Sequence, residues 1–224
     1  MQENEFYCII HNKVISLERG LIMDCTGEST RAKIYNEYDI KAIGCIVLYG
    51  GREVKSDAGG KLITDKYYKF LCIHKNDGHH EFIQCGYPTA KLICDAKGIE
   101  LPSEFNPFKG TGGIGSSKGG KSVSPKNKGR RQLISAIMLF VTSKDDILKP
   151  ETAIFKVKER IEKNMYSNLE LRDVKAVNTI LGNFHTNITK IITELGLHGT
   201  VRKYNFDILI KMIDDNKITP NNYR

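Results

Sequence analysis

The sequence predicts an α+β protein made of two folded parts that a flexible, basic segment joins. Apolar residues recur with a period of about two over residues 1–108 and of about 3.6 over residues 132–224, spacings typical of strands and of helices. Between these parts, residues 109–131 carry seven glycines, seven basic residues and no acidic or aromatic residue. Such a segment buries too little apolar surface to offset its ordering entropy. We therefore expect a mostly antiparallel β domain with a helix, a flexible linker and a small all-helical bundle.

Runs of β-forming residues dominate the first part, and turn-forming residues separate them. The sequence Asn-Asp-Gly at residues 76–78 lies between two of these runs and predicts a β-hairpin. After the last run, Pro88 can occupy the first turn of a helix and Gly98 can end it. The expected strands cover residues 6–10, 14–17, 21–23, 40–49, 69–74 and 80–85.

Two registers of this hairpin are open. If residues 77 and 78 alone form the turn, His74 pairs with Glu81. If the loop has three residues, His74 pairs with His80, and Cys85 points to the opposite face of the ribbon. The register therefore decides which side chains share a face.

Cysteine and histidine side chains on this hairpin form a candidate metal site. All six cysteines lie in the first part, and we expect free thiols because the N-terminal residues lack the apolar core of a secretion signal. In the first register the candidate ligands share a face, but as a row along the ribbon that is too long for one tetrahedral ion. The default interpretation is buried thiols and solvated imidazoles, so we expect no cofactor. The alternative is zinc bound by Cys72, His74, His79 and Cys85.

A metal-dependent nuclease is the enzyme class that the sequence approaches most closely. Many such enzymes combine an Asp with a later Glu-x-Lys strand, so that two carboxylates hold the metal. Asp39, Glu53 and Lys55 occur in that order. However, Asp39 begins an extended run, and at about 3.3 Å per residue the two carboxylates would lie tens of ångströms apart. These three residues are the candidate catalytic set, with unfavourable spacing.

Helical spacing governs the second part. Residues 133–141 are apolar on every side, which predicts a central, buried helix. Pro150 can open the next helix, and Asn205 can cap the last one. Together with a third helix between them, these elements predict a small four-helix domain.

The third of these helices has the longest apolar stripe. Ser167 and Glu170 match a capping box at its start. The apolar residues then alternate at intervals of three and four, which predicts one continuous helix that ends at Gly196. The stripe consists of Val174, Val177, Leu181, Phe184, Ile188, Ile191 and Leu195.

The excess positive charge of the chain is concentrated in the linker, since the net charge is +8 and the linker holds seven basic residues and no acidic one. Residues 115–122 match the letters of a phosphate-binding P-loop, but no strand precedes them and Pro125 prevents a following helix, which argues against an ATPase. A mobile polycation instead gains free energy by releasing counterions from a polyphosphate. The candidate nucleic-acid-binding residues are Lys118, Lys121, Lys126, Lys128, Arg130 and Arg131.

These observations favour a nucleic-acid-binding accessory or scaffold protein that is not an enzyme. Its partners would be DNA or RNA and, through the helical domain, a further protein. One alternative is a metal-dependent nuclease-like enzyme, and the other is a protein–protein adaptor without nucleic-acid contact. No apolar run approaches the ~18 residues of a membrane span, and no small-molecule substrate is indicated. We expect the protein in the cytoplasm, or in the nucleus of a eukaryote.

Overall fold

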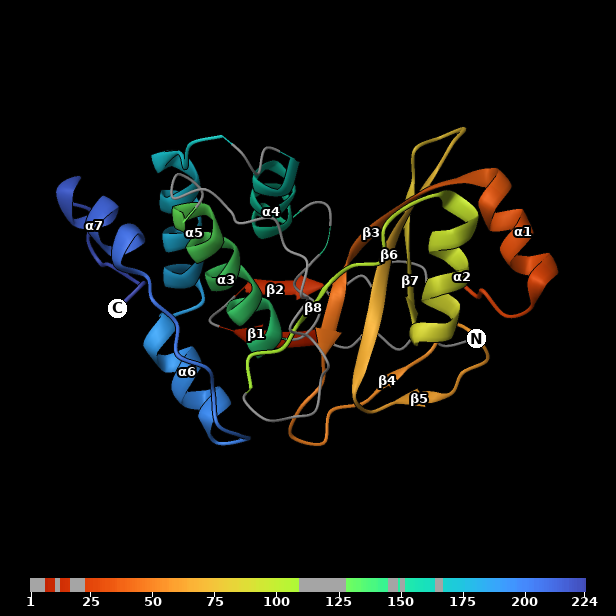
Figure 1. Ribbon diagram of the computed structural model, residues 1–224, viewed down its shortest axis with the longest axis horizontal. Coiled ribbons are helices and arrows are strands. Elements are labelled where there is room, and N and C mark those ends of the chain that lie inside the picture. The colour runs from red at the N-terminus through yellow and green to blue at the C-terminus, as the bar shows by residue number, and fades with distance from the viewer. Residues whose placement is uncertain are drawn as a thin grey trace. The chain divides into compact units, whose positions relative to one another are not determined.

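The computed structural model describes residues 7–10, 13–16, 23–108, 128–144, 149, 152–163 and 167–224 (Figure 1). It has mixed α/β content, with the sheet region in the N-terminal half and most helices in the C-terminal half. The chain divides into two compact units. The first unit is Met1–Gly44 with Glu53–Pro102, and the second is Cys45–Arg52 with Ser103–Arg224.

The elements follow one another in the order that the colours of Figure 1 trace. The strands are β1 (Tyr7–Ile10), β2 (Lys13–Ser16), β3 (Tyr38–Val47), β4 (Val54–Lys55), β5 (Leu62–Ile63), β6 (Lys66–His74), β7 (His80–Cys85) and β8 (Glu104–Phe105). The helices are α1 (Glu28–Glu37), α2 (Tyr87–Lys97), α3 (Lys128–Ser143), α4 (Ala153–Lys163), α5 (Leu171–Asn183), α6 (Ile188–Gly196) and α7 (Asp207–Asp215).

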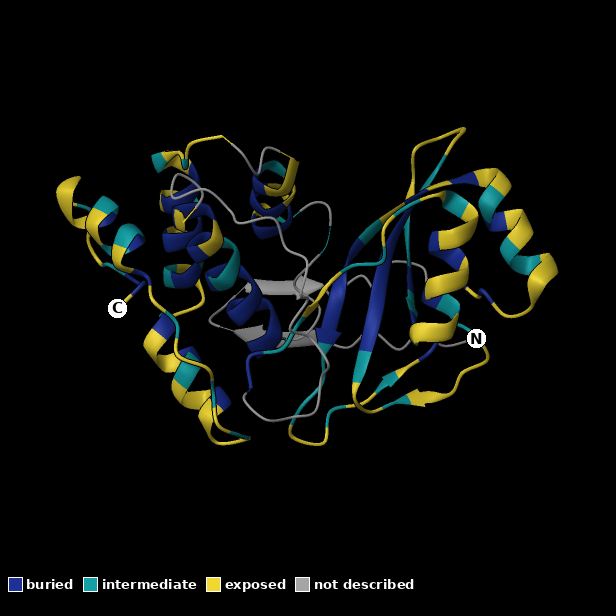
Figure 2. Cartoon of the chain, in the orientation of Figure 1, coloured by how far each residue is buried: buried dark blue, intermediate teal, exposed yellow. Residues whose placement is uncertain are grey.

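The main sheet has four strands in the order β7-β6-β3-β8. Strands β6 and β7 form the expected antiparallel hairpin, whereas β8 pairs in parallel with the end of β3. The pairs β1–β2 and β4–β5 form two further, two-stranded sheets. Both faces of β6 are buried along most of its length (Figure 2), since every residue from position 67 to position 72 is buried, Lys69 included.

Helix α2 has the predicted ends. Pro88 lies in its first turn, and Gly98 stops it in the left-handed conformation with φ of 62°. The ammonium group of Lys97 donates hydrogen bonds to the backbone oxygens of Tyr35 and Tyr38, at 3.1 and 3.2 Å. These bonds fasten the end of α2 to the end of α1, a helix that the sequence analysis did not predict.

In the second unit, α3 is buried on nearly every side, as its apolar sequence predicts (Figure 2). The prediction of one continuous third helix is wrong, because the chain forms two helices there, α5 and α6. Five helices therefore follow residue 127 in the part of the chain that the structure describes. The capping box is also wrong, because α5 begins after Glu170 without a side-chain cap and Ser167 binds elsewhere.

Residues 45–52 and 103–108 belong to the helical unit, although sequence analysis assigned them to the sheet domain. The guanidinium group of Arg52 donates to the backbone oxygens of Thr142 and Ser143 at the C-terminal end of α3, at 3.0 and 3.4 Å. A cation satisfies these terminal carbonyls and complements the helix dipole. Arg202 donates in the same way to the backbone oxygen of Phe108, at 3.0 Å.

None of the helices among the described residues combines the length and the apolar character that crossing a bilayer requires.

Candidate functional site

The hairpin has a register that neither prediction anticipated. Ile73 pairs with His80, and the loop of residues 75–78 ends on Gly78, whose φ of 73° favours glycine. Both predicted registers are therefore wrong. The observed pairing differs from the first predicted register, in which His74 pairs with Glu81, by two residues. An even shift leaves each side chain on the same face, so the faces are those of the first predicted register.

This face gathers three potential ligands at the tip of the hairpin. One carboxylate oxygen of Asp77 lies 2.8 Å from Nδ1 of His74 and 2.9 Å from Nδ1 of His79. The same oxygen accepts the backbone N–H of His79 at 3.1 Å. The ligand atoms of all three side chains lie within 4.8 Å of one another.

Two residues behind this cluster hold it in place. Oε1 of Glu81 lies 2.7 Å from Nε2 of His79 and accepts the hydroxyl of Tyr38 at 3.3 Å. The ring of Tyr38 lies against the rings of His74 and His79, with centroids 5.0 and 5.9 Å apart. Strand β3 thus supports a cluster that the hairpin loop builds.

These contacts shift the pKa values of Asp77 and His79 in opposite directions. Hydrogen bonds from the backbone and ring of His79, and then from His74, hold the pKa of Asp77 well below its usual range. Hydrogen bonds to Glu81 and then to Asp77 raise the pKa of His79. The tip is therefore a site where positive charge is favoured.

The two cysteines of the predicted zinc site do not join this cluster. Cys72 is completely buried opposite Glu81, and burial raises the pKa of its thiol to about 12. Cys85 pairs with Tyr68, four residues further along the ribbon than Cys72, or about 13 Å. The structure therefore brings together His74 and His79 but not Cys85, and it adds Asp77, which sequence analysis had treated only as a turn residue.

The candidate nuclease residues are dispersed. Asp39 is exposed near the start of β3, whereas Glu53 and Lys55 lie beyond its far end. Eight residues of extended strand, about 26 Å, separate Asp39 from Val47. Within the described part of the chain, neither the carboxylate of Asp39 nor that of Glu53 belongs to a group of three potential metal ligands.

The candidate nucleic-acid-binding residues differ in whether they are described and in how exposed they are. Lys118, Lys121 and Lys126 lie outside the described residues. Lys128 and Arg131 are exposed in the first turn of α3, which begins within the segment expected to be linker, and Lys128 forms an ion pair with Asp207 at 3.5 Å.

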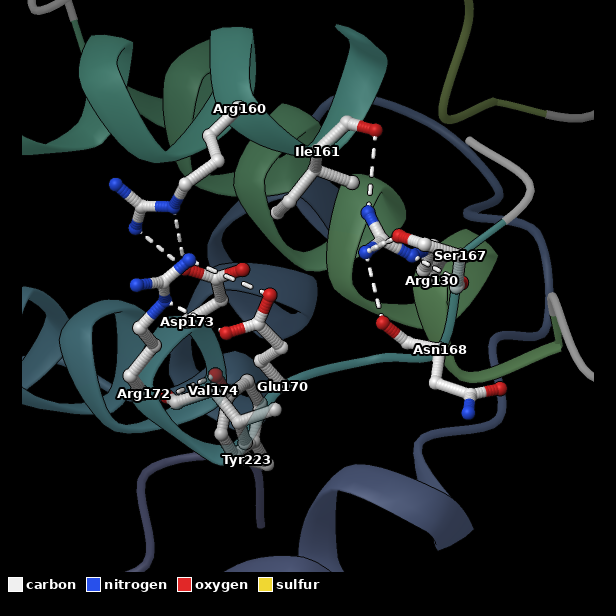
Figure 3. Close-up of polar contacts among 10 residues, drawn as sticks. All are labelled: Arg130, Arg160, Ile161, Ser167, Asn168, Glu170, Arg172, Asp173, Val174 and Tyr223. Carbon is white, nitrogen blue, oxygen red and sulfur yellow. Dashed lines mark hydrogen bonds and ion pairs between the residues drawn. The ribbon is translucent and has the colours of Figure 1, made fainter. Parts of the chain in front are cut away.

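Arg130 does not face solvent, contrary to the sequence-based prediction. Its side chain is buried, and its guanidinium group makes four hydrogen bonds that Figure 3 shows together. It donates to the backbone oxygens of Ile161 at 3.3 Å, Ser167 at 2.6 Å and Asn168 at 2.7 Å, and to the hydroxyl of Ser167. Arg130 thus ties α3 to the end of α4 and to the chain that enters α5, and it is not available to a phosphate.

The break between α5 and α6 creates a second candidate site. Residues 184–187 form a short turn in which His185 has a left-handed φ of 51°. Asn187 then caps α6, because its side chain accepts the backbone N–H of Lys190 at 2.8 Å. In Figure 1, α6 continues past the end of α5 instead of folding back along it. A short turn thus separates α5 from α6, and α6 begins with its own side-chain cap.

Comparison with protein-family models, with curated proteins and with solved structures found no match. The hairpin tip offers nitrogen and oxygen ligands, and the turn before α6 presents a short, polar helix face.

Proposed function

We propose that this protein binds nucleic acid, with α6 in the major groove of duplex DNA and the basic residues that precede and begin α3 on the phosphates. The observation that supports the proposal is the exposed polar face of α6, opposite the side that packs against the helical unit. A helix of this size fits the major groove, where base edges can be distinguished.

The two faces of α6 differ sharply in chemistry. Ile188, Ile191 and Leu195 are buried, and α6 packs through them against the rest of the helical unit. Thr189, Lys190 and Thr193 are exposed on the other side, near the start of the helix. Hydroxyl and ammonium groups at the beginning of a recognition helix can hydrogen bond to base edges.

Cations near this helix supply the contacts to phosphate. Arg202 and Lys203 follow α6 and are exposed, and Lys175 is exposed on α5. The backbone oxygen of Arg224 accepts the N–H of Thr189 at 3.5 Å, so the C-terminal residue lies beside the start of α6. Phosphate contacts of this kind fix orientation and register but carry no sequence information.

The basic arm would add affinity without selectivity. Seven basic residues occur between residues 109 and 131, and Arg130 has to be removed from the set because it is buried. The remaining cations precede or begin α3, in the same unit as α6. They would strengthen binding to any sequence and make it depend steeply on salt.

Fluorescence anisotropy with labelled duplexes tests both contributions in the full chain. Replacing Thr189, Lys190 and Thr193 by alanine should remove preference among duplex sequences. Replacing Lys118, Lys121 and Lys126 by serine should weaken all duplexes alike, and the log–log salt slope should become shallower by about 0.9 for each phosphate that is no longer neutralised. Lys156→Ala, which removes an exposed charge on α4, is the matched control and should change neither property.

A protein-docking adaptor is the second candidate, because two large apolar side chains of this unit are exposed. Leu197 is 81% exposed directly after α6, and Phe184 is 49% exposed in the turn before it. If the wild-type protein binds neither duplex DNA nor RNA at low salt, the nucleic-acid proposal fails and the adaptor replaces it.

A further inference from the structure

The hairpin tip has the donor atoms of a metal site that does not depend on cysteine. Two imidazole nitrogens and one carboxylate oxygen converge there from His74, Asp77 and His79. The side chains of His74, Asp77 and His79 are 20%, 61% and 41% exposed, so an ion can enter from solvent. All three belong to one hairpin, which places them by backbone pairing and by the tight loop that ends at Gly78.

The ring of His79 is oriented as a ligand would need to be. Its Nε2 atom is directed at Glu81, at 2.7 Å, which turns Nδ1 towards Asp77. A carboxylate behind a ligating imidazole is the usual support of a metal site, because it fixes the ring and the nitrogen that is free to bind. The side chain of Glu81 is only 14% exposed and is itself held by the hydroxyl of Tyr38.

We propose that Nδ1 of His74, Nδ1 of His79 and a carboxylate oxygen of Asp77 bind one divalent transition-metal ion of the zinc class, with water completing the coordination. Two imidazoles favour such an ion over calcium or magnesium, which take mainly oxygen ligands. The carboxylates of Asp77 and Glu81 balance its charge.

The geometry requires little adjustment. Zinc bonds of about 2.0–2.2 Å in a tetrahedral arrangement separate ligand atoms by roughly 3.4 Å. The observed separations of 2.8 and 2.9 Å between Asp77 and the two histidines are hydrogen-bond distances. Movement of the exposed Asp77 side chain by about half an ångström would open the space for the ion.

Titration of the chelator-treated full chain with Co²⁺ and with Zn²⁺ tests this proposal. We expect one ion per chain, with visible Co²⁺ absorption typical of nitrogen and oxygen ligands in a low-symmetry site. His74→Ala and His79→Ala should each abolish that spectrum. Asp77→Asn, which keeps an oxygen to accept the N–H of residue 79, should weaken binding, and Glu81→Ala should weaken it by about tenfold to a hundredfold.

The neighbouring His80 provides the control. It is exposed and pairs with Ile73 on the opposite face of the hairpin, so His80→Ala should leave the affinity and the spectrum unchanged. Circular dichroism checks that each variant is folded. Binding to the His74→Ala/His79→Ala double variant that equals binding to the wild type overturns the proposal, as does wild-type protein that takes up neither ion. Neither result bears on the proposed contact of α6 with DNA.

Discussion

Single residues in this protein take roles that their chemical type does not reveal. Arg130 and Arg131 are adjacent cations in the sequence, yet one is buried among backbone carbonyls and the other is exposed. The side chain of Asp173 is also buried, at 1% exposure, and its carboxylate accepts hydrogen bonds from the guanidinium group of Arg160 (Figure 3). Burial converts these charges into internal connections between α3, α4 and α5, because an unpaired buried charge is costly.

Arg130→Ala should therefore destabilise the helical unit, by about 2–4 kcal/mol, because it removes the buried donor to the Ile161 carbonyl and two part-buried bonds to the segment that enters α5. Arg131→Ala should change the free energy of unfolding by no more than about 0.5 kcal/mol, as expected for an exposed position. Urea unfolding of the two variants measures the difference. Equal stabilities would contradict the structural role of Arg130.

Asp57 gives a second prediction at this scale. Burial, and then the nearby charge of Asp24, raise the pKa of Asp57 to about 6, although the N–H of Gln84 and the charge of Lys69 act in the opposite direction. The folded protein thus holds this proton more tightly than the unfolded chain, whose carboxyl has the ordinary value of 3.8. The contribution of Asp57 to stability is greatest below pH 3.8, declines as the pH rises to about 6, and is constant above that.

Asp57→Asn should remove this dependence, since asparagine keeps an oxygen for the backbone N–H of Gln84, which Asp57 accepts at 2.6 Å. As the pH rises from about 4 to about 7, the wild type should lose stability relative to the variant, because only the wild type has the Asp57 carboxyl to ionise. Thermal unfolding across that range measures it. A constant difference between the two proteins would show that Asp57 does not titrate there.

At the scale of elements, the break between α5 and α6 changes which apolar residues are buried. Leu181 is completely buried, whereas Phe184, three residues later on the same predicted stripe, is 49% exposed and touches Phe140 edge-on. The C-terminal residues fill the space that the break opens. The backbone oxygen of Asn222 accepts the N–H of Ile188 at 2.9 Å, and the hydroxyl of Tyr223 donates to the backbone oxygen of Val174 at 2.7 Å.

Leu181→Ala should cost about 2–5 kcal/mol, as large-to-small changes in a core do. Phe184→Ala should cost less than half as much, because the ring already contacts solvent. Chemical unfolding of both variants tests this contrast. A single continuous helix with its whole stripe buried would instead make the two losses similar.

At the scale of the whole molecule, the two units do not coincide with two continuous stretches of sequence. Residues 45–52 belong with the helices, where Tyr49 packs against Phe108 and His198 and Arg52 binds the end of α3. A fragment that begins at residue 128 therefore lacks part of its own unit.

We expect trypsin to cut first at the lysines between residues 109 and 127, because that sequence carries basic residues and too few apolar ones to form a core. The two fragments should nevertheless stay together under native conditions, since segments on both sides of the cut complete the helical unit. Size-exclusion chromatography of the nicked protein tests this. Separation into two folded fragments would show that residues 45–52 and 103–108 are dispensable to the helices.

Local sequence patterns determined much of the fold. The strands around the hairpin follow from alternating β-formers and the Gly78 turn, and α2 from Pro88 and Gly98, because these signals act between residues close in the chain. The buried helix α3 follows from its apolar sequence for the same reason. Helix α1 escaped prediction because Ile34 is its sole buried residue, so it has no apolar stripe to recognise.

Only the tertiary structure decided the sites. The spacing of Val174 to Leu195 predicts one helix, and the break that divides it depends on the left-handed His185, the Asn187 cap and the C-terminal residues that pack into the break. Likewise, only one of the two predicted registers placed His74 and His79 on one face, and the pairing that brings Asp77 between them is fixed by the whole sheet. Periodicity reports which side of an element faces the core, whereas register, helix breaks and the burial of a charge depend on partners far along the chain.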